Sequence, residues 1–120
     1  NRGMARKLKG DLDGAISDYT RALEIDPKLI MALNQRGMVR RVRGDLDGAI
    51  ADYTRAMECD PKYVDSWFNR GHALKWNGNL AGALADWKQG LQLAPKHRKA
   101  RGIRAEIVRT RAQLEKQEEK

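Results

Sequence analysis

The side chains that most often carry out catalysis are few in this sequence and lie far apart. Its two histidines, His72 and His97, have no paired carboxylates, phosphate-binding loop or nucleophile–base set near them in the sequence. We therefore expect no catalytic residue. His72 is interpreted instead as a hydrogen-bond donor on a binding surface, and His97 as part of the first turn of a C-terminal helix.

The sequence also gives little support to a metal or cofactor site. The segment Gly-Asp-Leu-Asp-Gly occurs at residues 10–14 and 44–48, but it lacks the other ligands and the distal glutamate of a calcium loop. The single cysteine, Cys59, excludes an internal disulfide and supplies no metal cluster. It occupies the place of Ile25 and Leu93 in equivalent segments, which predicts a small core residue. We expect no metal and no cofactor.

Charged residues recur at a fixed interval. Arginines at 2, 36 and 70 and aspartates at 18, 52 and 86 are each spaced by 34 residues. Because both series repeat together, we predict Arg–Asp pairs between neighbouring helices, with a functional arginine ladder as the alternative. Exposed pairs of this kind contribute only about 0–1 kcal/mol each.

The same interval extends to small, aromatic and proline residues. A period of this length indicates a stack of identical helical units, which usually presents a surface for holding other molecules. The repeating structural positions are Gly3, Gly37, Gly71, Ala15, Ala49, Ala83, Tyr19, Tyr53, Trp87, Pro27, Pro61 and Pro95.

Each period predicts two helices. Residues 28–43 form the first helix and end at Gly44, which suits a left-handed cap. Asp45 and Asp47 begin a second helix that runs to about Cys59. Small residues such as Gly37 and Ala49 indicate close helix approach, and Tyr53 and Trp87 are expected to fill the gaps between successive helices. A large side chain at Gly37 or Ala49 is then expected to destabilise the stack.

The run of Trp67, Gly71, Gly78, Ala83, Trp87 and Pro95, with its equivalents one and two periods earlier, resembles the tetratricopeptide repeat. The resemblance covers residues 1–95: a first repeat that begins inside its first helix, and complete repeats at 28–61 and 62–95. Leu33 in place of Trp67, and Gly90 in place of Ala22 and Ala56, are departures that we interpret as packing variation. Residues 96–120 are expected to form a capping helix with a polar tail. The resemblance implies an all-α fold, a right-handed superhelix or α-solenoid of helix–turn–helix repeats.

The resemblance also implies a concave groove lined by the first helix of each pair. Its methionine, aromatic and basic side chains favour an acidic partner peptide with hydrophobic side chains. The alternative is that Phe68 and Trp76 pack against neighbouring helices. The expected groove residues are Met4, Lys7, Leu8, Asn34, Met38, Arg41, Val42, Phe68, His72, Lys75 and Trp76.

One subset of the family grips the C-terminal carboxylate of heat-shock chaperones with lysine, asparagine and arginine side chains. The corresponding positions here hold Met4, Gln35, Asp65 and Asn69. Only Asn69 is of a carboxylate-gripping type, and Asp65 is expected to repel the ligand. The resemblance therefore predicts a partner outside the chaperone-tail class.

Charge offers a second function. The net charge is +8, and residues 95–120 hold nine basic against four acidic groups. This basic helix is the basis for the alternative of nucleic-acid or acidic-surface binding, although it lacks aromatic residues for base stacking. The seven basic residues concerned are Lys96, Arg98, Lys99, Arg101, Arg104, Arg109 and Arg111.

Location and assembly follow only weakly from the sequence. No stretch is apolar enough for a membrane span. The absence of a visible signal or disulfide favours a cytoplasmic location. The shortened first repeat makes self-association a further expectation.

Overall fold

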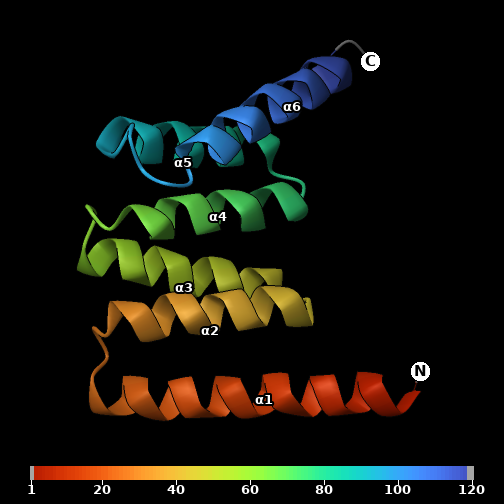
Figure 1. Ribbon diagram of the computed structural model, residues 1–120, viewed down its shortest axis with the longest axis vertical. Coiled ribbons are helices and arrows are strands. Elements are labelled where there is room, and N and C mark those ends of the chain that lie inside the picture. The colour runs from red at the N-terminus through yellow and green to blue at the C-terminus, as the bar shows by residue number, and fades with distance from the viewer. Residues whose placement is uncertain (1, 119–120) are drawn as a thin grey trace. The chain divides into compact units, whose positions relative to one another are not determined.

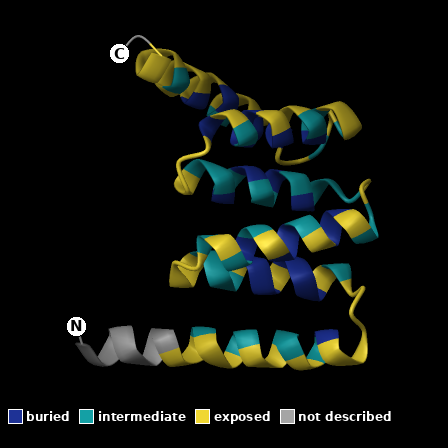
Figure 2. Cartoon of the chain, turned by 180° about the vertical axis from the view of Figure 1, so that it is seen from behind, coloured by how far each residue is buried: buried dark blue, intermediate teal, exposed yellow. Residues whose placement is uncertain are grey.

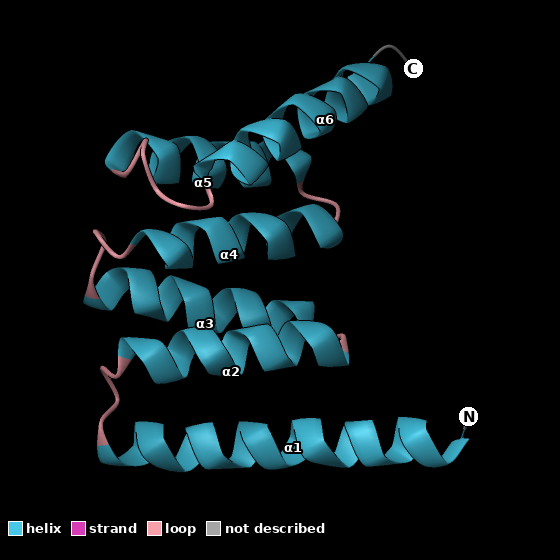
Figure 3. Ribbon diagram, in the orientation of Figure 1, coloured by secondary structure: helices cyan, strands magenta, loops and turns pink. Residues whose placement is uncertain are grey.

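The computed structural model describes residues 2–118, with side chains from residue 10 onward. These residues form six helices and no strand, joined by short loops (Figure 3). The all-α helical repeat predicted from the sequence is therefore confirmed. The helices are α1 (Arg2–Ile25), α2 (Ile30–Arg43), α3 (Leu46–Cys59), α4 (Val64–Trp76), α5 (Leu80–Leu93) and α6 (Ala100–Glu118).

The chain divides into two compact units, Asn1–Asp60 and Pro61–Lys120. In the first unit, α1, α2 and α3 follow one another in alternating directions, and α2 packs against both of the others (Figure 1). In the second unit, α5 packs against both α4 and α6. Each unit thus contains one complete helix pair and one additional helix. The right-handed superhelix stays a prediction.

The turn inside each helix pair has the chemistry that the sequence predicts. Gly44 ends α2 with φ 97°, and Gly78 has φ 88° after α4, a left-handed backbone that favours glycine. The Asp45 carboxylate then accepts a hydrogen bond from the Gly48 N–H at 3.0 Å and caps α3. Asn79 caps α5 in the same way, through the Gly82 N–H at 2.9 Å.

The first repeat departs from this helix–turn–helix pattern. Gly-Asp-Leu-Asp-Gly forms a turn and a cap at residues 44–48, but at residues 10–14 it lies inside the continuous helix α1. Continuing the backbone hydrogen-bond ladder through Gly10 keeps its polar groups paired.

Each unit has its own hydrophobic core, and its buried residues lie on the helix faces that meet (Figure 2). In the first unit Cys59 is half-buried and packs at the edge of the cluster, as expected for a structural residue. In the second unit α6 inserts two isoleucines beside Trp87. The buried clusters are Leu23, Ala32, Leu33 and Ala56, and Phe68, Ala83, Leu84, Trp87, Ile103 and Ile107.

The recurrent glycines of the first helices make room for the recurrent aromatic residues, as predicted. A Cβ atom built on Gly37 would lie 2.6 Å from Cε1 of Tyr53, and one built on Gly71 would lie 2.3 Å from Nε1 of Trp87. Tyr53 and Trp87 are both buried. Burial is also the main reason why the pKa of Tyr53 is raised to about 12, and the Asp52 carboxylate adds to it while Arg41 opposes it.

We expect Gly71→Ala to lower the free energy of unfolding by about 1–3 kcal/mol, because the added methyl group overlaps the buried indole. The matched control is Gly102→Ala in α6, where a Cβ meets no atom within 4 Å. That change is expected to stabilise the protein by up to about 1 kcal/mol through helix propensity. Urea unfolding measures both, and equal shifts for the two variants would contradict close packing at Gly71.

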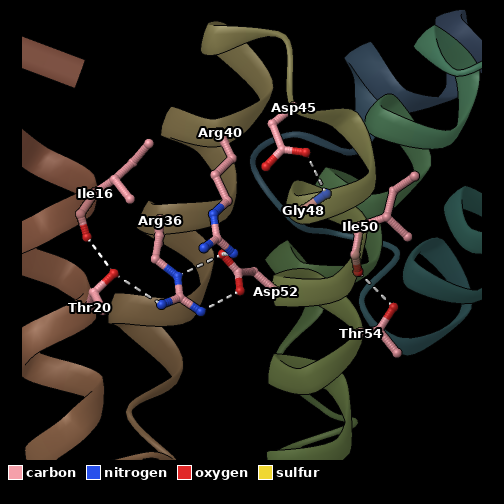
Figure 4. Close-up of polar contacts among 9 residues, drawn as sticks. All are labelled: Ile16, Thr20, Arg36, Arg40, Asp45, Gly48, Ile50, Asp52 and Thr54. Atoms are coloured by element: carbon pink, nitrogen blue, oxygen red, sulfur yellow. Dashed lines mark hydrogen bonds and ion pairs between the residues drawn. The ribbon is translucent and has the colours of Figure 1, made fainter. Parts of the chain in front are cut away.

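The predicted Arg–Asp pairs join the two helices of each complete repeat. In the first unit, Arg36 donates from Nε and Nη2 to the two Asp52 oxygens at 2.9 and 2.7 Å, and Arg40 donates to Asp52 at 3.0 Å (Figure 4). Arg36 also donates to the hydroxyl of Thr20 at 3.2 Å. Asp52 is buried, so this network is structural, and it is not a ladder of arginines facing a partner.

Arg70 and Asp86 repeat this bidentate arrangement in the second unit, with both distances 2.7 Å. The hydrogen bonds to Asp86 raise the pKa of Arg70 above its ordinary value, although burial opposes the shift. The third expected pair involves Arg2, whose side chain lies outside the described part of the structure. The surroundings of Gly3 and the side chains of Met4, Lys7 and Leu8 also lie outside it.

Candidate functional site

The exposed face of α2 carries apolar side chains. Met31, Met38 and Val42 are all exposed large hydrophobic residues, and their spacing places them along one side of the helix. Arg41 lies beside this face and is half-buried. Of the residues expected to line a groove in the first unit, Met38 and Val42 are therefore accessible to a partner.

Two expected groove residues are buried instead. Asn34 is 5% exposed, and Phe68, its equivalent one period later, is 1% exposed. Phe68 packs against Gly90, where a Cβ would lie 2.5 Å from its ring, and its ring meets His97 edge-on at 5.3 Å. The expectation that these two side chains face a partner is corrected, because both are buried.

The packing of Phe68 explains one departure from the repeat pattern. Gly90 occupies the place that Ala56 has in the preceding repeat, and the larger Phe68 occupies the place of Asn34. The bulkier side chain is thus matched by the smaller one opposite. This difference between repeats reflects core packing.

The remaining expected residues on α4 lie at or near its surface. His72 is half-buried and its ring meets Trp87 at a centroid distance of 5.3 Å. Lys75 is half-buried and donates to Glu106 of α6 at 2.9 Å. Trp76, the last residue of α4, is 65% exposed. A side chain of this size and exposure is of the type found at interface hot spots.

A surface pocket lies between α4 and α6, which we call the α4–α6 pocket. It has a volume of about 420 Å³ and is open to solvent. Sequence reasoning assigned the basic residues of α6 to a separate patch, so it missed their position next to His72. The sequence signal that could have indicated this pocket was Gly102, a glycine within the basic C-terminal helix. The lining residues are His72, Arg98, Lys99, Gly102, Ile103, Glu106 and Arg109.

Two carboxylates, Glu106 in the pocket lining and Asp65 of α4, lie next to basic side chains. Glu106 accepts from Lys75 and from Arg109, and the hydrogen bond from Lys75 is the main reason why the pKa of Glu106 is lowered, although burial opposes it. Asp65 lies 3.3 Å from Nε2 of His97 and 3.5 Å from Nζ of Lys99. Asp65 is therefore partly neutralised, which weakens its expected repulsion of an anionic ligand.

His97 lies in the turn before α6, whose first residue is Ala100. Its Nδ1 accepts a hydrogen bond from the backbone N–H of Lys99 at 3.1 Å. Its Nε2 lies near Asp65 and its ring packs against Phe68, both residues of α4. His97 therefore links this turn to α4. Its contacts are those of a structural residue.

A smaller pocket of about 260 Å³ lies between α1 and α2 in the first unit. On one side, the Tyr19 hydroxyl donates to the Gln35 side-chain oxygen at 2.6 Å. Its other lining side chains are apolar, namely Ala22, Leu29, Met31 and Ala32.

Neither pocket has the ligands of a metal centre. Within the part of the chain that the structure describes, no group of three or more histidine, cysteine or acidic side chains is placed to hold a metal ion. No helix among the described residues combines the length and apolar character that crossing a membrane requires.

Three family models match the sequence. One described as TPR repeat matches residues 37–78, and two described as tetratricopeptide repeat match residues 64–97 and 1–29. Together they extend over most of the chain. No curated protein sequence matches it.

Solved structures with the same fold include the Sgt2 TPR domain from Aspergillus fumigatus, which is 26% identical with a TM-score of 0.83 and covers 100% of this chain and 77% of its own. The first TPR of Spaghetti (RPAP3) bound to the HSP90 peptide SRMEEVD is 23% identical, with a TM-score of 0.79 and coverages of 94% and 87%. The TPR2B domain of yeast Sti1 in complex with an Hsp70 peptide is 22% identical, with a TM-score of 0.81 and coverages of 92% and 91%.

These similar structures bear on the expectation of a partner outside the chaperone-tail class. Two of them hold chaperone peptides, so the same fold accommodates such a ligand. Together with the neutralisation of Asp65, this conflicts in part with that expectation.

Proposed function

Since the chain belongs to the tetratricopeptide repeat family, we propose that it is a protein–protein interaction scaffold and catalyses no reaction. It binds segments of a partner protein on the exposed face of α2 and on that of α4. The similar structures that hold peptides support this proposal through their shared fold.

The observation that carries the proposal is the exposure of large apolar side chains at positions that differ between repeats. Val42 and Trp76 are equivalent residues at the ends of α2 and α4, and they are 62% and 65% exposed. Exposed side chains of this size add no core packing, but they provide apolar area and an anchor for a partner. Lys75 and the basic residues of α6 favour an acidic partner segment.

The alternative of nucleic-acid binding has weaker support. Arg104 donates to the Pro95 carbonyl at 2.8 Å, and Lys99 and Arg109 each lie against a carboxylate. Helix α6 contains no aromatic residue on which a base would stack. These contacts favour a protein partner.

A phage-displayed peptide library tests the proposal. We expect selected peptides to bind the chain, and the double variant Val42→Ser/Trp76→Ala to weaken binding by about 30-fold, equivalent to about 2 kcal/mol. The control is Val108→Ser, an equally exposed apolar residue of α6 outside these faces. Circular dichroism checks that each variant is folded.

Selection of no peptide, or equal weakening by Val108→Ser, contradicts the proposal. The HSP90 peptide SRMEEVD is measured alongside. If this peptide binds and its terminal carboxylate is required, the partner belongs to the chaperone-tail class. If other acidic peptides bind and this one does not, the partner lies outside that class, as the sequence predicts.

A further inference from the structure

We propose that the α4–α6 pocket is a subsite for an acidic side chain of the partner segment, and that Gly102 keeps this subsite open. The inference rests on the proposed function, because it assigns the chemistry of one part of that binding surface. It adds a specific ligand group, a carboxylate, and residues of α6 that the groove expected from the repeats did not include.

The charge of the pocket favours an anionic ligand. Four lysine and arginine side chains lie in or beside the pocket, namely Lys75, Arg98, Lys99 and Arg109, against the two carboxylates of Asp65 and Glu106. Two positive charges are therefore in excess. Among the described residues, the ion pairs include none for Arg98. A guanidinium at the rim of a pocket pairs readily with an incoming carboxylate through two parallel hydrogen bonds.

Three of the four cationic side chains, all except Arg98, already have carboxylate partners. Glu106 bridges Lys75 of α4 and Arg109 of α6, and Asp65 of α4 lies 3.5 Å from Nζ of Lys99. His72 is oriented by its contact with the Trp87 ring. Because these contacts restrain Lys75, Lys99 and Arg109 before a ligand arrives, these side chains lose less conformational entropy on binding.

The shape of the pocket also leaves room for a side chain of the partner. Gly102 has no side chain, and a Cβ built there meets no atom within 4 Å, so the space above it is open. Ile103 behind it is buried in the core of the second unit and gives the pocket an apolar wall. An open depression with an apolar wall and a cationic rim fits the methylene groups and carboxylate of a glutamate.

A peptide carboxylate is favoured over a nucleic-acid phosphate. No aromatic ring is among the pocket's lining residues apart from the imidazole of His72, so stacking of bases has little support. Arg101 and Arg111 are exposed basic residues of α6 that are not among the pocket's lining residues. The basic groups of α6 are therefore not all gathered at one phosphate-binding face.

The test uses the full chain labelled with ¹⁵N and a short blocked peptide in which glutamate and leucine alternate. Its neutral counterpart has glutamine in place of glutamate. We expect the glutamate peptide to shift the backbone amide signals of Gly102, Ile103 and Arg109, and to bind at least about tenfold more tightly than the glutamine peptide.

The variants separate a blocked pocket from a general change in helix stability. Gly102→Phe is expected to weaken the glutamate peptide by about tenfold or more, because its ring fills the open space, while Gly102→Ala changes affinity by less than about twofold. Arg98→Gln is expected to weaken binding by at least about threefold, with Arg101→Gln as the charge-matched control within about twofold. If Gly102→Phe fails to fold, the comparison of Arg98→Gln with Arg101→Gln decides.

Equal binding of the two peptides, full binding by folded Gly102→Phe, or equal effects of the two arginine variants would overturn the subsite. Oligothymidylate that shifts the same amides and displaces the peptide would assign the pocket to phosphate and overturn the peptide proposal. Library peptides that need Val42 and Trp76 but ignore Gly102→Phe would retain the scaffold function and remove this subsite. If the glutamate peptide shifts these amide signals but the library yields no binding peptide, the subsite is retained and the scaffold function is removed.

Discussion

Phe68→Ala is expected to lower the free energy of unfolding by about 3–5 kcal/mol, because it removes a fully buried aromatic side chain and leaves a cavity. The lost ring contacts Gly90 and the imidazole of His97, so the turn before α6 is loosened at the same time. Urea denaturation followed by circular dichroism measures the change.

The control for this prediction is Trp76→Ala in the same helix. Trp76 is 65% exposed, and an exposed substitution of this kind is expected to change stability by about 0.5 kcal/mol or less. Equal stability losses for the two variants would show that Trp76 is a core residue. A stable Phe68→Ala protein would show that Phe68 does not hold the second unit together.

Asp52→Ala is expected to lower the free energy of unfolding by a similar amount, about 3–5 kcal/mol. Asp52 is 3% exposed and accepts hydrogen bonds from both Arg36 and Arg40 (Figure 4). Its removal leaves two neighbouring cations without their shared carboxylate, and Arg36 is itself buried. Thermal and urea unfolding measure the loss.

Glu58→Ala is the matched control, since Glu58 is an exposed acidic residue of the same helix. It lies near the C-terminal end of α3, where a negative charge is not favoured by the helix dipole. We therefore expect a neutral or slightly stabilising effect. A loss for Glu58→Ala as large as that for Asp52→Ala would mean that net charge, and not the buried pair, determines stability.

The period in the sequence predicted the pair contacts well because each depends on local geometry repeated in every unit. Gly37 with Tyr53 and Arg36 with Asp52 recur one period later as Gly71 with Trp87 and Arg70 with Asp86. The same spacing produces the same contact because each pair joins two helices of similar length through a short turn with a left-handed glycine.

The period was a poorer guide to which varying residues face solvent. The sequence analysis placed Asn34 and Phe68, which differ between repeats, among the residues that line a binding groove. Phe68 packs against Gly90, where the preceding repeat has Asn34 and Ala56 at the equivalent positions, and all four residues are buried. The residue pattern of one helix does not show whether the facing helix carries a residue small enough to accommodate a larger side chain.

The segment Gly-Asp-Leu-Asp-Gly shows that the local sequence does not fix the backbone conformation either. At residues 44–48 it forms a left-handed glycine and a helix cap, and at residues 10–14 it continues a helix. Identical residues adopt both conformations because the turn is stable only where the helices on either side pack together.

By itself, the sequence determined the all-α repeat, the helix ends marked by Gly44 and Gly78, and the residues that join the two helices of a pair. Those features depend on contacts within one period, which the sequence repeats. Only the tertiary structure placed His72 beside Arg98, Lys99 and Arg109, because α6 carries no repeat signature and its position depends on packing Ile103 and Ile107 into the core of the second unit.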